Sequence, residues 1–359
     1  MSGLHPVRIL IVTDAWSPQI NGVVRTLKAV IAELQRKGHD VRTINPDGRK
    51  TWPMPLYAEI SLTRMSVRQM LKEISSIGPD VIHIATEGPL GWVARWACLR
   101  EGLKFTTGFH TRFAEYAAAR IPLPGVLGLG WNVLRRFHAP SQAVMVPTKS
   151  IGEELDRRNF SNVKIWTRGV DRNIFKAYPR DHLDFPRPIL LYAGRLAVEK
   201  GIDDFMKLQS PGSKVLVGDG PERPRLEKLY PGAHFLGFRH GEDYARTLAA
   251  ADVMVFPSRT DTFGLVMLEA MACGTPVAAY DAPSAMDVVG HRVTGCVADR
   301  LEDAVDQASR LDREAVRHGS MHYSWETCAT MFESWLVPCR QGRSLQSELT
   351  AAESFVHLR

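Results

Sequence analysis

Residues 253–280 read VMVFPSRTDTFGLVMLEAMACGTPVAAY, and this stretch decides the fold. Val253–Phe256 is a short apolar run of strand type. Leu265–Cys273 carries a helical pattern, which Gly274-Thr275-Pro276 ends. Val277–Tyr280 is apolar again. A strand, a helix and a second strand in this order predict a βαβ unit.

The loop between the first strand and the helix, Pro257–Phe263, carries candidate chemistry. It leads into Phe263-Gly264-Leu265, where the backbone N–H groups at a helix N-terminus and the helix dipole favour a phosphate group. Asp261 precedes the helix, where it can meet a ligand; a helix N-cap is the alternative. Glu269 stands among apolar residues, so we expect its carboxylate to be buried or bound, with a partner.

The length and composition suit two domains with real cores, because the chain has 359 residues and 45% of them are hydrophobic. The five cysteines are scattered, without a CxxC pair or a Cys/His cluster. We therefore expect reduced thiols in a cytosolic protein, with no disulfide and no zinc site. The N-terminus leads directly into a strand and no run of about 18 apolar residues occurs, so neither a secretory signal nor a membrane span is expected.

The charge is unevenly distributed along the chain. Residues 1–170 carry a net charge of +10 and residues 171–359 a net charge of −4. A basic half favours an anionic partner, and nucleic acid, an anionic membrane and a phosphorylated substrate all qualify. A solvated basic face without a partner is the alternative. The basic half contains no recognised nucleic-acid-binding motif, so nucleic acid is not the expected partner.

The first half alternates strands and helices. Val7–Thr13 is a buried strand, and the loop after it reaches Gly22, which opens a helix to Arg36. Ligands of α/β sheets bind at such places, at the carboxyl ends of the strands, although many glycines there only shape a turn. Residues 45–63 are rich in proline and are predicted as loop. Further strands are predicted at 40–44, 79–84, 105–110, 142–147 and 163–167.

Two features of the first half are candidate functional elements. His110 ends a predicted strand, which suits an active-site residue of an α/β sheet; a structural or surface histidine is the alternative. Residues 121–140 (IPLPGVLGLGWNVLRRFHAP) are apolar and then gain Trp131, Arg135 and Arg136. An aromatic and basic edge on an apolar stretch fits a peripheral membrane contact. A core helix capped by arginines is the alternative.

The second half repeats the α/β rhythm, with strands predicted at 189–193, 214–217, 234–236, 253–256 and 277–280. Arg195 and Lys200 follow the first of these strands on a glycine-bearing loop. A guanidinium binds phosphate oxygens bidentately and an ammonium adds a point charge, so the two predict a pyrophosphate cradle; two solvated cations are the alternative. No GxxxxGK[ST] loop occurs, nor a GxGxxG after the first strand, which disfavours ATPase and NAD-binding functions.

Together these motifs resemble the group 1 retaining glycosyltransferases, glycosyltransferase family 4. The second half carries the specific motifs, which are Gly194-Arg195-Leu196, Glu199-Lys200-Gly201, Gly218-Asp219-Gly220-Pro221, Gly237-Phe238, Thr262-Phe263-Gly264 and residues 269–277. Arg168-Gly169-Val170-Asp171 matches the family's interdomain segment. The first half matches more loosely, through Pro18, Asn21-Gly22-Val23 and His110. The resemblance covers residues 7 to 336, approximately.

The resemblance implies an α/β fold of GT-B architecture, with two Rossmann-like domains facing an interdomain cleft. The expected acceptor-binding domain spans residues 1–172, and the expected nucleotide-sugar-binding domain spans 173–324. The last helix, at about 325–359, is expected to pack back on the first domain. The composition also shifts at residues 173–188, where prolines fall among charges.

The resemblance also implies roles for individual residues. Arg195 and Lys200 would neutralise the diphosphate leaving group, and Glu269 would hold the ribose hydroxyls. The family's paired acidic motif normally begins with Glu. In this chain Asp261 stands at that position, and its side chain is one methylene shorter than that of Glu. The difference affects the contact that the family's Glu makes with the donor sugar.

The remaining implied contacts come from loops. Phe263, Gly264 and Leu265 would present N–H groups to the donor. His110 would contact the donor sugar, and Gly22 would let the first loop approach the diphosphate. We thus expect Arg195, Lys200, His110 and Asp261 to be catalytic.

The expected reaction is a retaining glycosyl transfer without metal or cofactor, because fixed cations and N–H groups stabilise the leaving group. The basic first half, residues 121–136 and a loose resemblance to glycolipid-forming members of the family suggest a lipid acceptor at the inner face of the plasma membrane. We therefore expect a glycolipid synthase that uses a UDP-hexose as donor and a lipid such as diacylglycerol as acceptor. A GDP-mannose-dependent α-mannosyltransferase is the nearest alternative. A sugar-nucleotide epimerase and a nucleotide-binding regulator without catalysis are alternatives from other classes.

Overall fold

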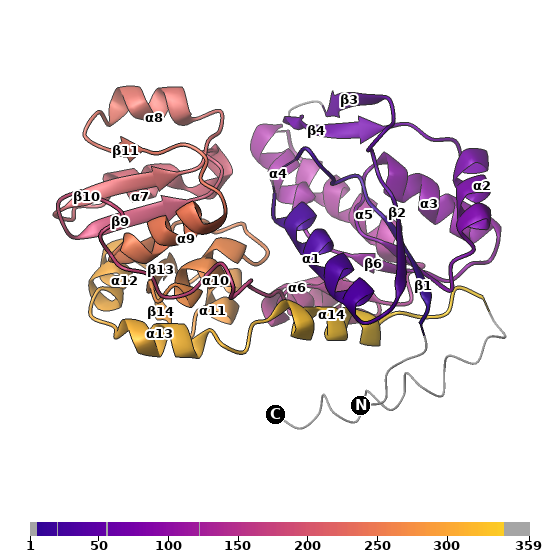
Figure 1. Cartoon of the computed structure of the whole chain (residues 1–359). Helices are drawn as coiled ribbons and strands as arrows, with labels where there is room; N and C mark the ends of the chain where they lie inside the picture. Colours follow the sequence, from indigo (N-terminus) through magenta and orange to yellow (C-terminus); the bar gives the residue numbers. More distant parts are fainter. Residues whose placement is uncertain (1–5, 20, 55–56, 122, 341–359) are drawn as a thin grey trace. The chain divides into compact units, whose positions relative to one another are not determined.

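The computed structural model divides into two compact units (Figure 1). Unit 1 comprises Met1–Thr167 and Trp325–Arg359, and unit 2 comprises Arg168–Ser324. The structure describes residues 6–19, 21–54, 57–121 and 123–340. Residues 341–359, which the expected last helix includes, lie outside the described residues.

Unit 1 is built on a six-stranded parallel sheet with the strand order β2-β1-β5-β6-β7-β8. Alternate residues of its first strand enter different cores, since Leu10 and Val12 pack on one face and Ile9 and Ile11 on the other. Both faces are covered, which is why the strand is apolar from Ile9 to Val12. The strands are β1 (Arg8–Val12), β2 (Asp40–Ile44), β5 (Val81–Ile84), β6 (Thr106–Gly108), β7 (Val144–Val146) and β8 (Val163–Ile165).

Some helices of unit 1 begin at a polar side chain that caps the first turn. Asn21 Oδ1 accepts from the N–H groups of Val23 and Val24, and Thr148 Oγ1 accepts from Ile151. The helices are α1 (Gly22–Arg36), α2 (Val67–Ile77), α3 (Pro89–Arg100), α4 (Phe113–Arg120), α5 (Val126–His138), α6 (Lys149–Arg157) and α14 (Trp325–Ser334). α4 is not among the predicted elements.

Residues 51–54 and 57–63 pair in an antiparallel two-stranded sheet apart from the main sheet (Figure 1). Its strands are β3 (Thr51–Met54) and β4 (Tyr57–Thr63). The loop predicted for residues 45–63 is therefore wrong over these two strands. Proline lacks an N–H and argues against a central strand. In a two-stranded sheet both strands are edge strands, so Pro53 is tolerated. The register of the pairing shifts between Pro53 and Met54.

The last helix, α14, belongs to unit 1 although unit 2 precedes it in the chain. Trp166 Nε1 donates to the carbonyl oxygen of Cys328 at 3.1 Å. Lys37 Nζ and His39 Nε2 contact the two carboxylate oxygens of Glu333 at 2.6 and 3.0 Å. These contacts fix α14 against α1 and the end of β8.

Unit 2 holds a second six-stranded parallel sheet, with the strand order β11-β10-β9-β12-β13-β14. Its strands are β9 (Ile189–Ala193), β10 (Ser213–Val217), β11 (His234–Phe235), β12 (Val253–Phe256), β13 (Val277–Tyr280) and β14 (Gly295–Ala298). Its helices are α7 (Ile202–Lys207), α8 (Arg223–Leu229), α9 (Gly241–Ala250), α10 (Leu265–Ala272), α11 (Pro283–Val288), α12 (Leu301–Ala308) and α13 (Arg313–Gly319). α11 and α13 are not among the predicted elements.

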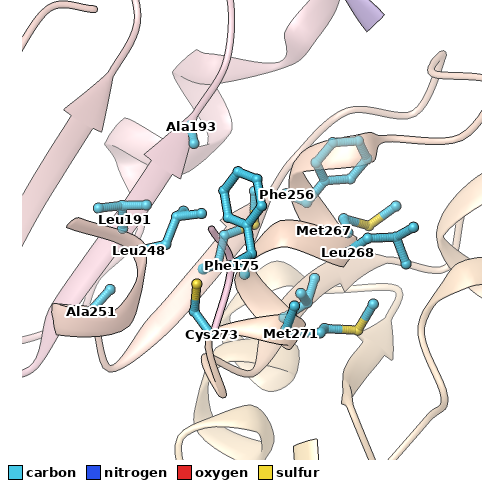
Figure 2. Packing of buried hydrophobic residues seen from close by; sticks show 14 of the residues in the cluster. Phe175, Leu191, Ala193, Leu248, Ala251, Phe256, Met267, Leu268, Met271 and Cys273 are labelled. Carbon is cyan, nitrogen blue, oxygen red and sulfur yellow. The ribbon is translucent and has the colours of Figure 1, made fainter. Parts of the chain in front are cut away.

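The stretch from 253 to 280 forms the predicted βαβ unit. β12 and β13 are parallel neighbours, with Met254 opposite Val277 and Phe256 opposite Ala279. α10 is buried from Met267 to Ala272. Figure 2 shows Met267 gathered with Phe175 and Phe256 in the core that α10 helps to form. A helix with so little solvent-facing surface holds the loop before it in a fixed place.

Candidate active site

The loop between β9 and α7 lies against the loop between β12 and α10. Gly201 has a φ of 67°, and a Cβ there would lie 2.7 Å from the carbonyl oxygen of Pro257. Thr260 Oγ1 donates to the carbonyl oxygen of Glu199 at 3.1 Å. Only a glycine permits this approach, because a side chain would meet backbone atoms. The approach brings the segment of Lys200 to the segment of Asp261.

Ion pairs join the charged residues of these two loops. Lys200 Nζ pairs with the carboxylate of Asp261, and the two side chains are 22% and 15% exposed. Arg195 Nη1 lies 3.8 Å from Glu199 Oε1, and the side chain of Glu199 is almost fully buried. The structure therefore brings Arg195, Lys200 and Asp261 into one cluster.

Glu199 is a member of this cluster whose motif was found in the sequence but to which no role was assigned. Its spacing of four residues after Arg195 is the signal that could have indicated its role. A nearly buried carboxylate needs a cationic partner, and the nearby guanidinium supplies one.

The start of α10 is the third part of this site. Gly264 has a φ of 83°, and a Cβ there would lie 2.8 Å from both Phe256 Cζ and Met267 Cε. Gly264 is the N-cap and no side chain caps the helix. The alternative of Asp261 as the N-cap is therefore wrong. The helix N-terminus presents backbone N–H groups of a kind that binds anions.

Phe263 and Leu265 flank this turn. The side chain of Phe263 is buried and packs edge-on against Tyr323, with ring centroids 6.1 Å apart. Because its side chain is buried, Phe263 could contact a ligand only through its backbone groups. Leu265 is the first residue of α10.

Glu269 is buried inside α10, at 3% exposure. Tyr244 Oη, from α9, donates to its Oε2 at 3.2 Å. The expectation of a buried carboxylate with a partner is confirmed. The contact with ribose hydroxyls stays a prediction.

Tyr192 is a buried residue that holds the backbone of the cluster in place. Its hydroxyl donates to the carbonyl oxygen of Arg195 at 2.7 Å. Burial raises the pKa of Tyr192 well above its usual range. The hydroxyl therefore keeps its proton at physiological pH and holds the backbone of Arg195.

His110 lies in unit 1, two residues beyond the end of β6. It is buried and stands edge-on to Trp166, with ring centroids 5.5 Å apart. A Cβ at Gly108 would lie 2.6 Å from His110 Nε2, so a glycine there makes room for the imidazole. Arg112 fixes the loop that follows, since its Nη1 lies 2.9 Å from Glu154 Oε2.

The segment that leads from β1 into α1 contains Gly22 and a carboxylate that sequence reasoning missed. Gly22 is the first residue of α1. Asp14 is buried and accepts from the N–H groups of Leu90 and Gly91 at 2.9 and 3.2 Å. Burial raises the pKa of Asp14 to about 6, against the opposing effect of these hydrogen bonds. An acidic residue directly after a buried strand was the available signal, and its structural effect is to tie the β1 loop to the start of α3.

The predicted membrane residues on α5 divide between two faces. Trp131 is 6% exposed, stacks on Phe109 at 6.0 Å and has the guanidinium of Arg158 over its ring at 4.0 Å. Its position is in the core, as the core-helix alternative predicts, so its proposed contact with a membrane surface is corrected. Arg135 and Arg136 are exposed.

Three further observations concern the described part of the chain only. It contains no group of three or more His, Cys, Asp or Glu side chains that could hold a metal ion. No helix in it combines the length and the apolar composition that crossing a membrane requires. A cavity of about 620 Å³ beside α2, lined in part by Leu71, Lys72 and Arg340, contains none of the predicted site residues.

Two family models match the chain. Residues 187–313 match the glycosyl transferases group 1, and residues 20–173 match glycosyltransferase family 4. The two matches together cover more than half of the chain and include the Arg195–Lys200 loop and α10. The chain belongs to this family of glycosyltransferases, and it is an enzyme of the transferase class.

Individual relatives agree with this assignment. A GDP-mannose-dependent α-mannosyltransferase of Mycobacterium tuberculosis is 30% identical over 330 residues, which cover 83% of this chain and 87% of the relative. The α-monoglucosyldiacylglycerol synthase of Acholeplasma laidlawii is 23% identical over 76% of this chain and 79% of its own length. Sucrose-phosphate synthase from Thermosynechococcus elongatus has the same fold, with a TM-score of 0.72, 21% identity and coverage of 96% of this chain and 100% of that chain. The fold is thus the GT-B type, with two Rossmann-like domains.

Proposed function

We propose that this enzyme transfers a hexosyl unit, with retention of configuration, from a nucleoside diphosphate sugar to a membrane lipid acceptor. The observation that carries the proposal is the cluster of Arg195 and Lys200 on a loop that lies against the loop leading into α10. Two cations and a helix N-terminus suit a diphosphate leaving group.

In this reaction the bond between the sugar and the diphosphate breaks, and negative charge grows on the departing oxygen. The ammonium of Lys200, the guanidinium of Arg195 and the N–H groups at the start of α10 stabilise that charge. The acceptor hydroxyl attacks from the face on which the diphosphate leaves and gives its proton to the departing phosphate oxygen, so the sugar keeps its configuration. Glu269 holds the ribose hydroxyls, and His110 contacts the donor sugar.

We propose that this chemistry needs no metal ion, because fixed cations take the place that a divalent ion would have. The test is transfer in the presence of a chelator. Undiminished transfer supports the proposal. Activity that the chelator abolishes, and that only Mg²⁺ or Mn²⁺ restores, contradicts it.

The relatives support GDP-mannose as the first donor to examine, since the mannosyltransferase of M. tuberculosis is named for that donor. A UDP-hexose with diacylglycerol as acceptor is the second candidate, and the name of the A. laidlawii synthase supports the glucosyl unit and the diacylglycerol. We assign a lipid acceptor to both candidates, because the basic character of residues 1–170 favours an anionic membrane surface. We therefore also propose that the enzyme works at the inner face of the plasma membrane.

The experiment is a matrix of radiolabelled nucleotide sugars against membrane lipids, read by chromatography. Label that moves from GDP-mannose into a lipid supports the first candidate, and label from UDP-glucose into diacylglycerol supports the second. Interconversion of UDP-sugars without an acceptor would instead indicate an epimerase. The absence of turnover with every donor and acceptor would indicate a nucleotide-binding regulator.

A further inference from the structure

Asp261 pairs with the same ammonium group that the proposed reaction assigns to the diphosphate. Its carboxylate contacts Lys200 Nζ, and both side chains are partly withdrawn from water. A partly buried ion pair is screened less than a surface pair, so it holds the ammonium in a defined direction. The cation thus has an acidic partner before any donor arrives.

The cluster as a whole is balanced in charge. Arg195 and Lys200 supply two positive charges, and Glu199 and Asp261 supply two negative charges. A diphosphate adds further negative charge at the same place. Because like charges repel at close range, the diphosphate and the carboxylate of Asp261 compete for Lys200.

The geometry of the two loops lets this competition proceed without a large rearrangement. The loops are held together by the bond from Thr260 Oγ1 to the carbonyl oxygen of Glu199 and by the close approach of Gly201 to Pro257. Neither contact involves the side chain of Asp261. That side chain can therefore leave Lys200 by rotation while the backbone keeps its place.

We propose that Asp261 is an exchange residue, which holds Lys200 when the diphosphate site is empty and turns to the donor sugar when a diphosphate takes the ammonium. The proposal rests on the function proposed above and deepens it. An intact nucleotide sugar replaces the lost ion pair with a contact between Asp261 and the sugar. A nucleoside diphosphate, which is the product, breaks the ion pair and offers no sugar in return.

The consequence is a site that favours substrate over product. Asp261 returns to Lys200 once the sugar has left, and this return helps to expel the nucleoside diphosphate. The shorter side chain of Asp, at a position where the family normally has Glu, gives a carboxylate that reaches this ammonium.

The test measures the binding of GDP, UDP and GDP-mannose by calorimetry, without acceptor, to the wild type, Asp261→Asn, Lys200→Met and the double variant. Asp261→Asn is expected to bind the nucleoside diphosphate roughly two- to fivefold more tightly than the wild type, because a partly exposed ion pair no longer opposes it. In the Lys200→Met background the same change is expected to give no gain, because the two residues act as a pair. The preference for GDP-mannose over GDP is expected to fall in Asp261→Asn.

A matched control separates exchange from a general effect of charge. Asp203, on α7, is exposed and pairs with Arg225, and Asp203→Asn changes the net charge of unit 2 by the same amount. This control should bind GDP and UDP like the wild type. Thermal unfolding of each variant verifies the fold, and Asp261→Ser provides a second removal of the carboxylate.

The outcomes distinguish the two proposals. Equal or weaker binding of the nucleoside diphosphate by Asp261→Asn, or a gain that persists in the Lys200→Met background, overturns the exchange and leaves the transfer function in place. Failure of the wild type to bind GDP, UDP or GDP-mannose overturns both.

Discussion

Gly264 illustrates how one residue joins backbone geometry to the proposed chemistry. It adopts a φ of 83° in a place where a Cβ would touch Phe256 and Met267. The backbone therefore turns directly from the Asp261 loop into the first turn of α10. No residue with a Cβ could adopt this positive φ and also avoid a clash with Phe256 and Met267.

Replacing Gly264 by Ala is expected to lower the free energy of unfolding by about 1–3 kcal/mol, because the new side chain is strained in this backbone region. Urea unfolding measures the loss, and titration with a nucleoside diphosphate should show weaker binding as well. Gly232 is the matched control, since a Cβ there meets nothing within 4 Å and its φ is not in the left-handed region. Equal loss in Gly264→Ala and Gly232→Ala would contradict the role of this turn.

The sequence could identify the members of the site but not all of their contacts. Arg195, Lys200, Gly264 and Glu269 were predicted from motif and spacing. The pairing of Lys200 with Asp261 spans 61 residues and depends on the close approach of two loops, which no local pattern encodes. Sequence reasoning therefore assigned Asp261 to a ligand or a cap.

At the scale of elements, α14 is attached to unit 1 through a charged cluster. Glu333 on α14 meets Lys37 and His39 at the end of α1. Burial opposes ionisation of Glu333, but the hydrogen bonds from His39 and Lys37 outweigh it and lower the pKa. The carboxylate therefore stays charged in the folded state to a lower pH than in the unfolded chain.

Replacing Glu333 by Gln is expected to destabilise the protein by about 1–3 kcal/mol at pH 7, since the ammonium of Lys37 loses its carboxylate partner. The pKa of Glu333 is lowered on folding from 4.5, so its contribution is fully present above that value and is lost as the pH falls through the folded pKa. Chemical unfolding of both proteins at pH 7 and at lower pH measures the difference. A gap between wild type and variant that grows on acidification would contradict this attachment.

The amphipathic helix α5 is the element that the membrane proposal depends on. Its buried face includes Trp131 and Leu134, and its exposed face includes Leu129 and Val133, at 66% and 44% exposure, beside Arg135 and Arg136. Exposed apolar side chains next to arginines suit the surface of an anionic bilayer. This distribution replaces the role that the sequence suggested for Trp131.

Reversing the charges of α5, with Arg135→Glu and Arg136→Glu, is expected to weaken flotation with anionic vesicles by an order of magnitude or more, since each Arg near the surface contributes about 1 kcal/mol. The control reverses Lys149 and Arg157 on α6, which are exposed on the same unit. Flotation that is unchanged in the α5 variant, or reduced equally in the control, would argue against α5 as the membrane contact.

Helices and strands were predicted correctly where the sequence pattern indicated a single structure. They were missed where two sequence patterns indicated different structures. The predicted and observed bounds agree for four strands, β2, β9, β12 and β13. Each of these strands is a short run of strand-forming residues with turn-forming residues next to it. The β3–β4 hairpin was missed because Pro53 and Pro55 argue for a loop, while pairing at an edge tolerates Pro53. The short helices α4, α11 and α13 depend on packing within their units, which a single sequence does not display.

At the scale of the whole molecule, each unit carries a parallel sheet covered on both faces, and the family identity follows from motifs in both halves. The choice of sugar and acceptor was not predictable, because it depends on a few contacts rather than on the architecture. The cations of unit 2 are therefore decisive for the proposed reaction, because every candidate donor carries a diphosphate that they would bind.

The most direct test is the rate of sugar transfer from GDP-mannose, and from UDP-glucose, to membrane lipid in the presence of a chelator, for the wild type, Arg195→Ala and Lys200→Ala. We expect transfer by the wild type, with each variant slower by about 10²–10³-fold and unchanged in thermal unfolding, because each lost cation stabilises the leaving group. Lys207→Ala, an exposed change at the end of α7, should transfer at the wild-type rate. Transfer at the normal rate in both Arg195→Ala and Lys200→Ala would contradict the account.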